Sequence, residues 1–232
     1  MYMENNNKND ILKAVGAISM LIDHLGAVFF PQMIILRAIG RLAFPIFAYQ
    51  VALGFKKTRN EGKYIFRMLM FAILSSYPFY AFSMIVTQEP GYQNVLFTFF
   101  FALLVLKYIK EKKWMNMVLV GILPVVALEF AGIRFDYGLY GIACVAVFYI
   151  AKDHIQRSAG IFAVTVLYLS AIILSAGRSI IDVFSNLQLL SVLSVYIIDR
   201  KFKINVRLPR YFFYLFYPLH MMLIALIYNA LL

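Results

Sequence analysis

The sequence predicts an all-α membrane protein, a polytopic bundle of transmembrane helices that forms a single integral membrane domain over residues 1–232. Three observations lead to this prediction. Of the 232 residues, 63% are hydrophobic and only 14% are charged, whereas a soluble domain has about 25% charged residues. Many of the apolar residues lie in runs close to the length of about 20 residues that a helix needs to cross a bilayer. The basic residues are concentrated between these runs.

Nine apolar segments are candidate membrane spans. They cover residues 11–30, 34–55, 64–86, 95–110, 114–131, 137–151, 159–175, 180–198 and 211–230. The first follows the polar stretch MYMENNNKND, and no small-x-small cleavage site precedes Asp23, so we expect a retained helix and not a signal peptide. The fourth, sixth and seventh segments are short for a crossing, which leaves eight or ten spans as alternatives.

The positions of Lys and Arg predict the orientation. If the N-terminus is cytoplasmic and the chain crosses nine times, all but four of the 22 Lys and Arg residues fall in cytoplasmic segments, as the positive-inside rule requires. Eight or ten crossings would spoil this asymmetry. The net charge of +11 is therefore explained by topology and not by nucleic-acid binding. We expect a multi-pass protein of the bacterial cytoplasmic membrane, N-in and C-out.

The single cysteine, Cys144, lies in an apolar run. One cysteine cannot form an intrachain disulfide or a CxxC pair, and no metal-binding cluster is visible around it. Redox chemistry and a metal site are therefore not expected.

Four ionisable residues lie within the first two apolar runs: Asp23, His24, Arg37 and Arg41. A charged side chain at the centre of a membrane helix costs roughly 2.5–3.5 kcal/mol, so such residues usually face a partner or a functional cavity. The spacing of the two arginines puts both on one helix face, where we expect one of them to pair with Asp23. A histidine titrates near neutrality, so His24 is the candidate general base.

Each of these residues has a simpler interpretation as well. Asp23 and His24 are also compatible with a hydrogen bond between packed helices, and Arg37 with snorkelling to the headgroups. Arg41 lies a full turn deeper in the segment and is less able to reach the surface. A cluster of all four nevertheless predicts a site in the outer half of the bundle.

Further polar residues could share one cavity with these four. The loop that ends at Asp136 falls at the same outer end of the bundle, whereas His220 lies near the middle of the last span, just after Pro218, which should kink the helix. Asn94, Asp136 and Tyr217 are candidates for substrate binding. Asn94 and Asp136 are equally well explained as a helix cap and a turn residue.

The basic loop FKKTRNEGKY is a candidate for binding the phosphates of a cytosolic donor. Its residues, with one from the following helix, are Lys56, Lys57, Arg59 and Arg67. The alternative is a solvated cytoplasmic turn that attracts anionic lipid.

The sequence closely resembles the TraX family of integral membrane proteins. The resemblance rests on LKAVGAISMLIDHLGAVF, LRAIGRLAFPIFAYQVALGFKKTRN, KYIFRMLMFAILSSYPF, NVLFTFF, DYGLYGI and YFFYLFYPLHMMLI, which occur in this order from Leu12 to Leu223. The best-known member of the family acetylates the N-terminus of a conjugative pilin. The family is also similar in plan to broader transmembrane acyltransferases, which pass an acetyl group from cytosolic acetyl-CoA to an acceptor across the membrane.

The resemblance implies an acetyl-CoA-dependent O- or N-acetyltransferase without a metal. The residues that carry over to matching positions are His24, Asp23, Arg37, Arg41 and His220. The acceptor would be an amine or hydroxyl of an envelope or secreted molecule, such as a pilin or peptide N-terminus or a glycan.

Two alternatives stay open. One is a proton-coupled transporter or flippase, which intramembrane charges also suit, although the sequence has no visible inverted repeat. The other is a non-enzymatic envelope assembly protein.

Overall fold

The computed structural model of the protein describes residues 2–177, 183, 186–200, 202, 207–209 and 211–231, and only the backbone of residues 2–9. Regular structure in this part of the chain is almost entirely helical. The helices are α1 (Tyr2–Phe29), α2 (Ile34–Gly40), α3 (Ala43–Lys57), α4 (Glu61–Leu74), α5 (Ser76–Val86), α6 (Val95–Lys110), α7 (Trp114–Asn116), the π-helical η1 (Met117–Ile122), α8 (Leu123–Phe130), α9 (Gly138–Ile150), α10 (His154–Ser175), the 3₁₀-helical η3 (Leu187–Val192), α11 (Leu193–Asp199) and α12 (Phe212–Leu231). Two short strands, β1 (Tyr92–Gln93) and β2 (Arg134–Phe135), pair in parallel.

Several helices are long and apolar enough to cross a membrane. Within the described residues there are four such segments, Asp10–Phe29, Ile34–Lys57, His154–Ser175 and Phe212–Leu231, and up to five if the bent pair α4–α5 forms one span. Shorter apolar helices cover Trp114–Phe130, Gly138–Ile150 and Leu187–Asp199. The prediction of an all-α membrane protein is thereby confirmed. The count of nine crossings and the N-in, C-out orientation stay predictions.

Each of the nine predicted segments contains helix in its described part. Residues 180–182, 184 and 185 of the eighth segment lie outside the described residues, and its described helices begin at Leu187.

Prolines interrupt two of the predicted spans. The axes of α4 and α5 meet at Ser75 and differ by 52°, because Pro78 cannot donate to the carbonyl of Leu74 and its ring crowds that carbonyl. Pro45 stands in the same relation to Arg41, and the chain makes a turn at Arg41 and Leu42 between α2 and α3. Arg41 therefore lies at the join between these two helices, within the Ile34–Lys57 segment.

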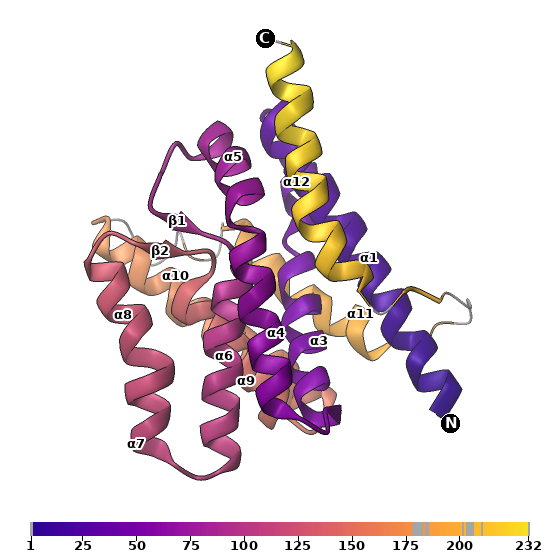
Figure 1. Ribbon diagram of the computed structural model, residues 1–232, viewed down its shortest axis with the longest axis vertical. Coiled ribbons are helices and arrows are strands. Elements are labelled where there is room, and N and C mark those ends of the chain that lie inside the picture. The colour runs from indigo at the N-terminus through magenta and orange to yellow at the C-terminus, as the bar shows by residue number, and fades with distance from the viewer. Residues whose placement is uncertain are drawn as a thin grey trace.

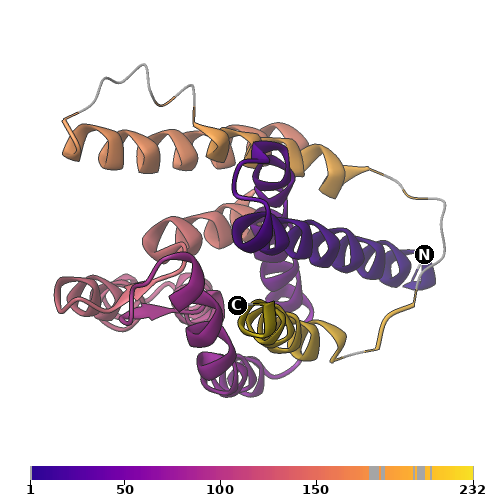
Figure 2. The ribbon, with the colours of Figure 1, turned by 90° about the horizontal axis from the view of Figure 1, so that it is seen from above.

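The first and last helices lie side by side (Figure 1) and contact each other. They run in the same direction, so the two termini lie at opposite ends of the bundle. Figure 2 shows α1 between α12 on one side and the α10–α11 segment on the other. Termini at opposite ends are what an odd number of crossings requires.

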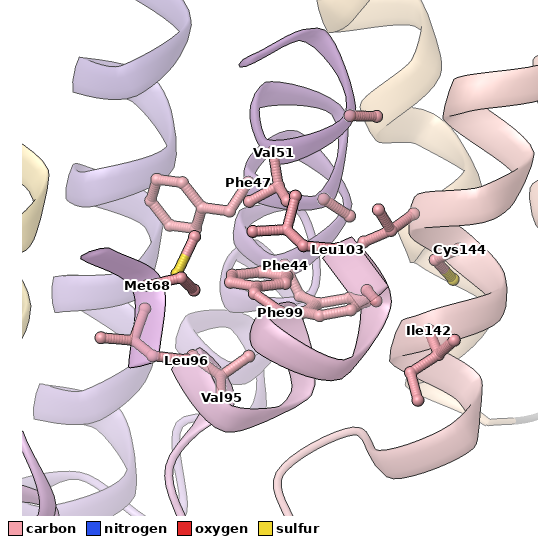
Figure 3. Packing of buried hydrophobic residues seen from close by; sticks show 14 of the residues in the cluster. Phe44, Phe47, Val51, Met68, Val95, Leu96, Phe99, Leu103, Ile142 and Cys144 are labelled. Carbon is pink, nitrogen blue, oxygen red and sulfur yellow. The ribbon is translucent and has the colours of Figure 1, made fainter. Parts of the chain in front are cut away.

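The apolar core lies where α3, α6 and α9 meet. Figure 3 shows side chains of these helices close together, with Phe44 stacked near Phe99, and with Ile142 and Cys144 on α9. Cys144 is fully buried and carries a free thiol. Large apolar side chains also cover the exterior, including Leu167 and Leu219, which are 70% and 58% exposed. Such a surface is expected of helices that face lipid.

Candidate active site

A cavity of about 260 Å³ lies between α1, α3, α5 and α12. Its walls combine phenylalanine rings with an unusual number of polar side chains for the interior of an apolar bundle. The polar lining residues are Asp23, His24, Arg37, Arg41, Ser83, Thr87, Tyr92, Asp136, Tyr137, Tyr168, Gln188 and Tyr217. The structure thus brings six of the predicted site residues to one cavity.

Asp23 forms ion pairs with both arginines. Its Oδ2 lies 2.8 Å from Nη1 of Arg37, and its Oδ1 lies 3.3 Å from Nη2 of Arg41. The sequence predicted that Asp23 pairs with one of the two arginines. That ion pair is confirmed, and the second arginine also takes part in it. Two guanidinium groups against one carboxylate leave a net positive charge at the cavity wall, which favours an anion there.

The two arginines use their donors differently. Arg41 donates from Nε to the Arg37 carbonyl, from Nη1 to Gln188 Oε1 and from Nη2 to Asp23. Each of its three nitrogens is therefore engaged in fixing the cluster. Arg37 makes both of its hydrogen bonds, to the carboxylate and to the carbonyl of Asp23, from Nη1. Within the described part of the chain, Nε and Nη2 of Arg37 stay available for a ligand.

Gly40 allows this cluster to form. It ends α2 directly before Arg41, and a Cβ at this position would collide with the carboxylate of Asp23. Any larger residue would push α2 away from α1 and separate the charges.

His24 is hydrogen-bonded to His220, which lies 196 residues later in the chain. Nδ1 of His24 lies 2.8 Å from Nε2 of His220, and the two ring planes differ by 9°. Nδ1 of His220 lies 2.7 Å from the carbonyl oxygen of Phe216, one turn earlier in α12. The bond links the first helix to the last at the edge of the cavity.

These contacts determine the tautomers of the neutral pair. A carbonyl oxygen only accepts, so Nδ1 of His220 carries the hydrogen and donates it to Phe216. Nε2 of His220 then has the lone pair and accepts from Nδ1–H of His24. Nε2 of His24 therefore carries no hydrogen and has a free lone pair, and His24 lines the cavity. This is the arrangement that a general base requires.

Asp136 lies on the opposite wall, in the turn after β2. Its Oδ1 accepts from the hydroxyl of Tyr92 at 2.9 Å, and its carbonyl accepts from Thr98 at 2.6 Å. The β1–β2 pairing holds it there, because its backbone N–H donates to Gln93. Burial raises the pKa of the Asp136 carboxyl to about 6.

Asn94 does not line the cavity. It is fully buried, its side-chain oxygen accepts from the N–H of Leu96, and its amide donates to the carbonyl of Ala72. These contacts make Asn94 the N-cap of α6 and connect α6 to α4. Asn94 is therefore the helix cap that the sequence offered as the alternative to a substrate-binding role. Tyr217 is buried and lines the cavity.

The four predicted donor-binding residues separate into two pairs. Lys57 and Arg67 line a second cavity of about 260 Å³. Lys56 and Arg59 line neither cavity; Lys56 donates to the carbonyl of Phe148 and lies over the ring of Tyr149.

Gln188 and Tyr137 are site residues that the sequence reasoning missed. Gln188 bridges Arg41 and the hydroxyl of Tyr140, and Tyr137 lines the cavity beside Asp136. A glutamine within an apolar run was a usable signal, because an amide in such a segment needs partners. Among the residues described, no cluster of three or more His, Cys, Asp and Glu is placed to hold a metal ion.

A family model described as TraX protein matches residues 8–228. The chain is 31% identical over 236 residues to the probable fimbrial assembly protein FimC, serogroup H1, of Dichelobacter nodosus, a match that covers 92% of this chain and 93% of that protein. It is 41% identical over 49 residues to the uncharacterized protein RP591 of Rickettsia prowazekii (strain Madrid E), which covers 21% of this chain and 20% of the other. No solved structure matches the chain.

Proposed function

Because the chain belongs to the TraX family, we propose that it is an integral membrane acyltransferase that moves an acetyl group from acetyl-CoA to an amine or hydroxyl of an envelope or secreted acceptor. The observation that carries the proposal is the pair of histidines, which leaves a basic nitrogen of His24 at a cavity that also holds a cationic cluster. A merely structural hydrogen bond between helices would not need the second set of charges beside it.

The chemistry follows from the tautomers. The acceptor nitrogen or oxygen attacks the thioester carbonyl while Nε2 of His24 takes its proton. The new bond to the acetyl carbon forms, the bond from carbon to sulfur breaks, and the proton is returned to the departing CoA sulfur. His220 accepts the Nδ1–H of His24 throughout and stabilises the imidazolium, and a base of this kind contributes about 10²–10⁴ in rate.

Arg37 is the proposed partner of the negative charge that develops on the thioester oxygen. It retains donors that the ion pair with Asp23 does not use, and one well-placed donor to an oxyanion contributes about 10²–10³ in rate. Arg41 has the positioning role, because its three nitrogens hold Asp23, Gln188 and the end of α2.

The second cavity is the proposed site of the donor. Arg67 lies there over the rings of Tyr64 and Tyr214, at 5.3 and 5.8 Å. Its buried Nε has no hydrogen-bond partner in the part of the chain that the structure describes. An unpaired buried N–H is costly, so the position suits an anionic ligand group. The phosphates of acetyl-CoA supply one, and Lys57 adds a second cation.

The acceptor class is suggested by the relatives. The similar D. nodosus protein carries the name of a fimbrial assembly protein, which favours a pilin or another surface peptide with a free N-terminus as the acceptor. The same name also suits a non-enzymatic assembly factor, which would consume no CoA ester.

The test is incubation of the purified protein with acetyl-labelled acetyl-CoA and an envelope extract. The proposal requires label in a peptide, pilin or glycan together with a matching amount of free CoA. Accumulation of free CoA in one burst without acceptor would instead indicate an acyl-histidine intermediate. Release of no CoA by a protein that still supports fimbrial assembly would identify the assembly factor and overturn the enzymatic proposal.

A further inference from the structure

Three phenylalanines are shared by the two cavities. Phe47, Phe99 and Phe213 line both the cavity of His24 and the cavity of Arg67. They come from α3, α6 and α12, so three helices contribute one ring each. We call these three residues the phenylalanine partition.

The order of lining residues along the helices shows that the cavities lie end to end. On α1, Lys13 lines the second cavity and Asp23 the first, ten residues or about 15 Å further along the helix. On α3, which runs the other way, Phe44 lines the first cavity and Lys57 the second, with Phe47 between them. On α12, Phe213 lines both cavities, Tyr214 the second and Tyr217 the first. The three helices therefore agree on the direction of one axis, and on α3 the shared ring of Phe47 lies between the residues that line only one cavity.

Phe47 is held firmly in this position. Its side chain is 5% exposed, and Figure 3 shows it among the core residues of α3. A Cβ at Gly16 on α1 would lie 2.8 Å from the ring, so the ring already rests against the α1 backbone. Its other neighbour is Phe213, with ring centroids 4.1 Å apart and planes at 44°. Phe213 is half-buried near the start of α12, which makes it the ring with room to turn aside.

We propose that the phenylalanine partition is the passage through which the acyl end of the donor reaches His24, and that its rings determine which acyl groups are transferred. This inference rests on the proposed function, because it requires a donor on one side and the base on the other. The thioester of a donor whose phosphates are held at Arg67 has to pass between Phe47 and Phe213 to reach Nε2 of His24. An acetyl group fits past a slightly turned ring, whereas each further methylene has to displace it.

The test compares acyl donors of different length. Purified wild-type protein and variants are given acetyl-CoA, butyryl-CoA or hexanoyl-CoA with the envelope extract, and the initial rate of CoA release is measured. Discrimination against one methylene in a fitted pocket is about 10–200-fold. Phe47→Ala and Phe213→Ala should therefore raise the ratio of butyryl to acetyl transfer at least tenfold.

Phe55→Ala is the matched control. Phe55 is buried two turns further along α3 and lines neither cavity, so it should reduce stability without changing the ratio. If Phe47→Ala does not fold, Phe47→Leu and the half-buried Phe213→Ala give the same comparison.

The outcomes separate the two proposals. Suppose that the wild type transfers acetyl groups normally and that the Phe47, Phe213 and Phe55 variants all show the wild-type donor ratio. This result refutes the role of the phenylalanine partition and leaves the proposed function intact. A wild type that releases no CoA from any donor refutes the proposed function and the passage with it.

Discussion

The removal of the His24 imidazole is the most informative single perturbation of this molecule. His24→Ala deletes the proposed base, which contributes about 10²–10⁴ in rate, or roughly 2.7–5.4 kcal/mol at 1.36 kcal/mol per tenfold. The cost in stability is smaller. The change removes the hydrogen bond to His220 and leaves Nε2 of that buried imidazole unpaired, at a cost of about 1–3 kcal/mol, and it removes a ring contact with Phe82 at 4.5 Å. Since His24 lines a cavity, its loss leaves no void in packed core.

The assay is the initial rate of CoA release, measured with a thiol reagent. The only cysteine of the chain is fully buried, so its background reaction should be low. The expected kcat of His24→Ala is at most one hundredth of the wild-type value, with an unchanged yield of folded protein. Added imidazole should restore part of the rate, because the cavity has room for a free ring.

His154→Ala is the control. Its side chain is 53% exposed and pairs with Asp199 on the surface, where ion pairs contribute about 0–1 kcal/mol. Its transfer rate should stay within twofold of the wild type. Near-normal transfer by purified His24→Ala would refute the assignment of the base.

Four other changes test the neighbouring groups. Arg37→Gln should lower kcat about 10²–10³-fold if Arg37 binds the oxyanion, and an effect on KM alone would contradict that role. Arg41→Lys keeps the charge but cannot make the three separate N–H contacts of a guanidinium group. A lost hydrogen bond to a charged group costs about 1.5–3 kcal/mol, so transfer should slow tenfold or more without a reduction in the amount of folded protein. Gly40→Ala forces a methyl group into the Asp23 carboxylate and should destabilise the protein by about 1–3 kcal/mol in thermal unfolding, whereas a wild-type Tm would show that the contact is loose. Asp136 has a raised pKa of about 6 in the folded protein, so its protonated form favours folding at low pH, and this contribution is lost as the pH rises from about 4 through 6. Asp136→Asn should therefore lose less stability than the wild type between pH 4.5 and 7. Parallel profiles of Tm against pH for the two proteins would argue against the raised pKa.

The helices were predictable from sequence because apolar length is a direct consequence of the bilayer. Each predicted segment contains helix where the chain is described. The interruptions at Arg41 and Ser75 were not predicted, although the prolines that cause them, Pro45 and Pro78, are visible in the sequence. Hydropathy averages over a span and does not register a missing N–H, so a proline within an apolar run has to be considered separately.

The site was predictable in its membership and not in its connections. The pairing of Asp23 with Arg37 could be predicted from their positions in apolar runs, since charged residues within a bilayer usually have partners. The bond between His24 and His220 has no local signal, because the packing of α1 against α12 alone decides which histidines meet. The same holds for Gln188, whose partner Arg41 lies 147 residues earlier in the chain.

The link between the first and last helices has a consequence for biogenesis. His24 leaves the ribosome well before His220, which is synthesised 196 residues later. A polypeptide whose synthesis or membrane insertion stops before α12 therefore presents His24 without its acceptor and without a defined tautomer. If His24 is the base of the proposed transfer, the protein becomes competent only after α12 has been synthesised and packed against α1, so products truncated before α12 should release no CoA from acetyl-CoA.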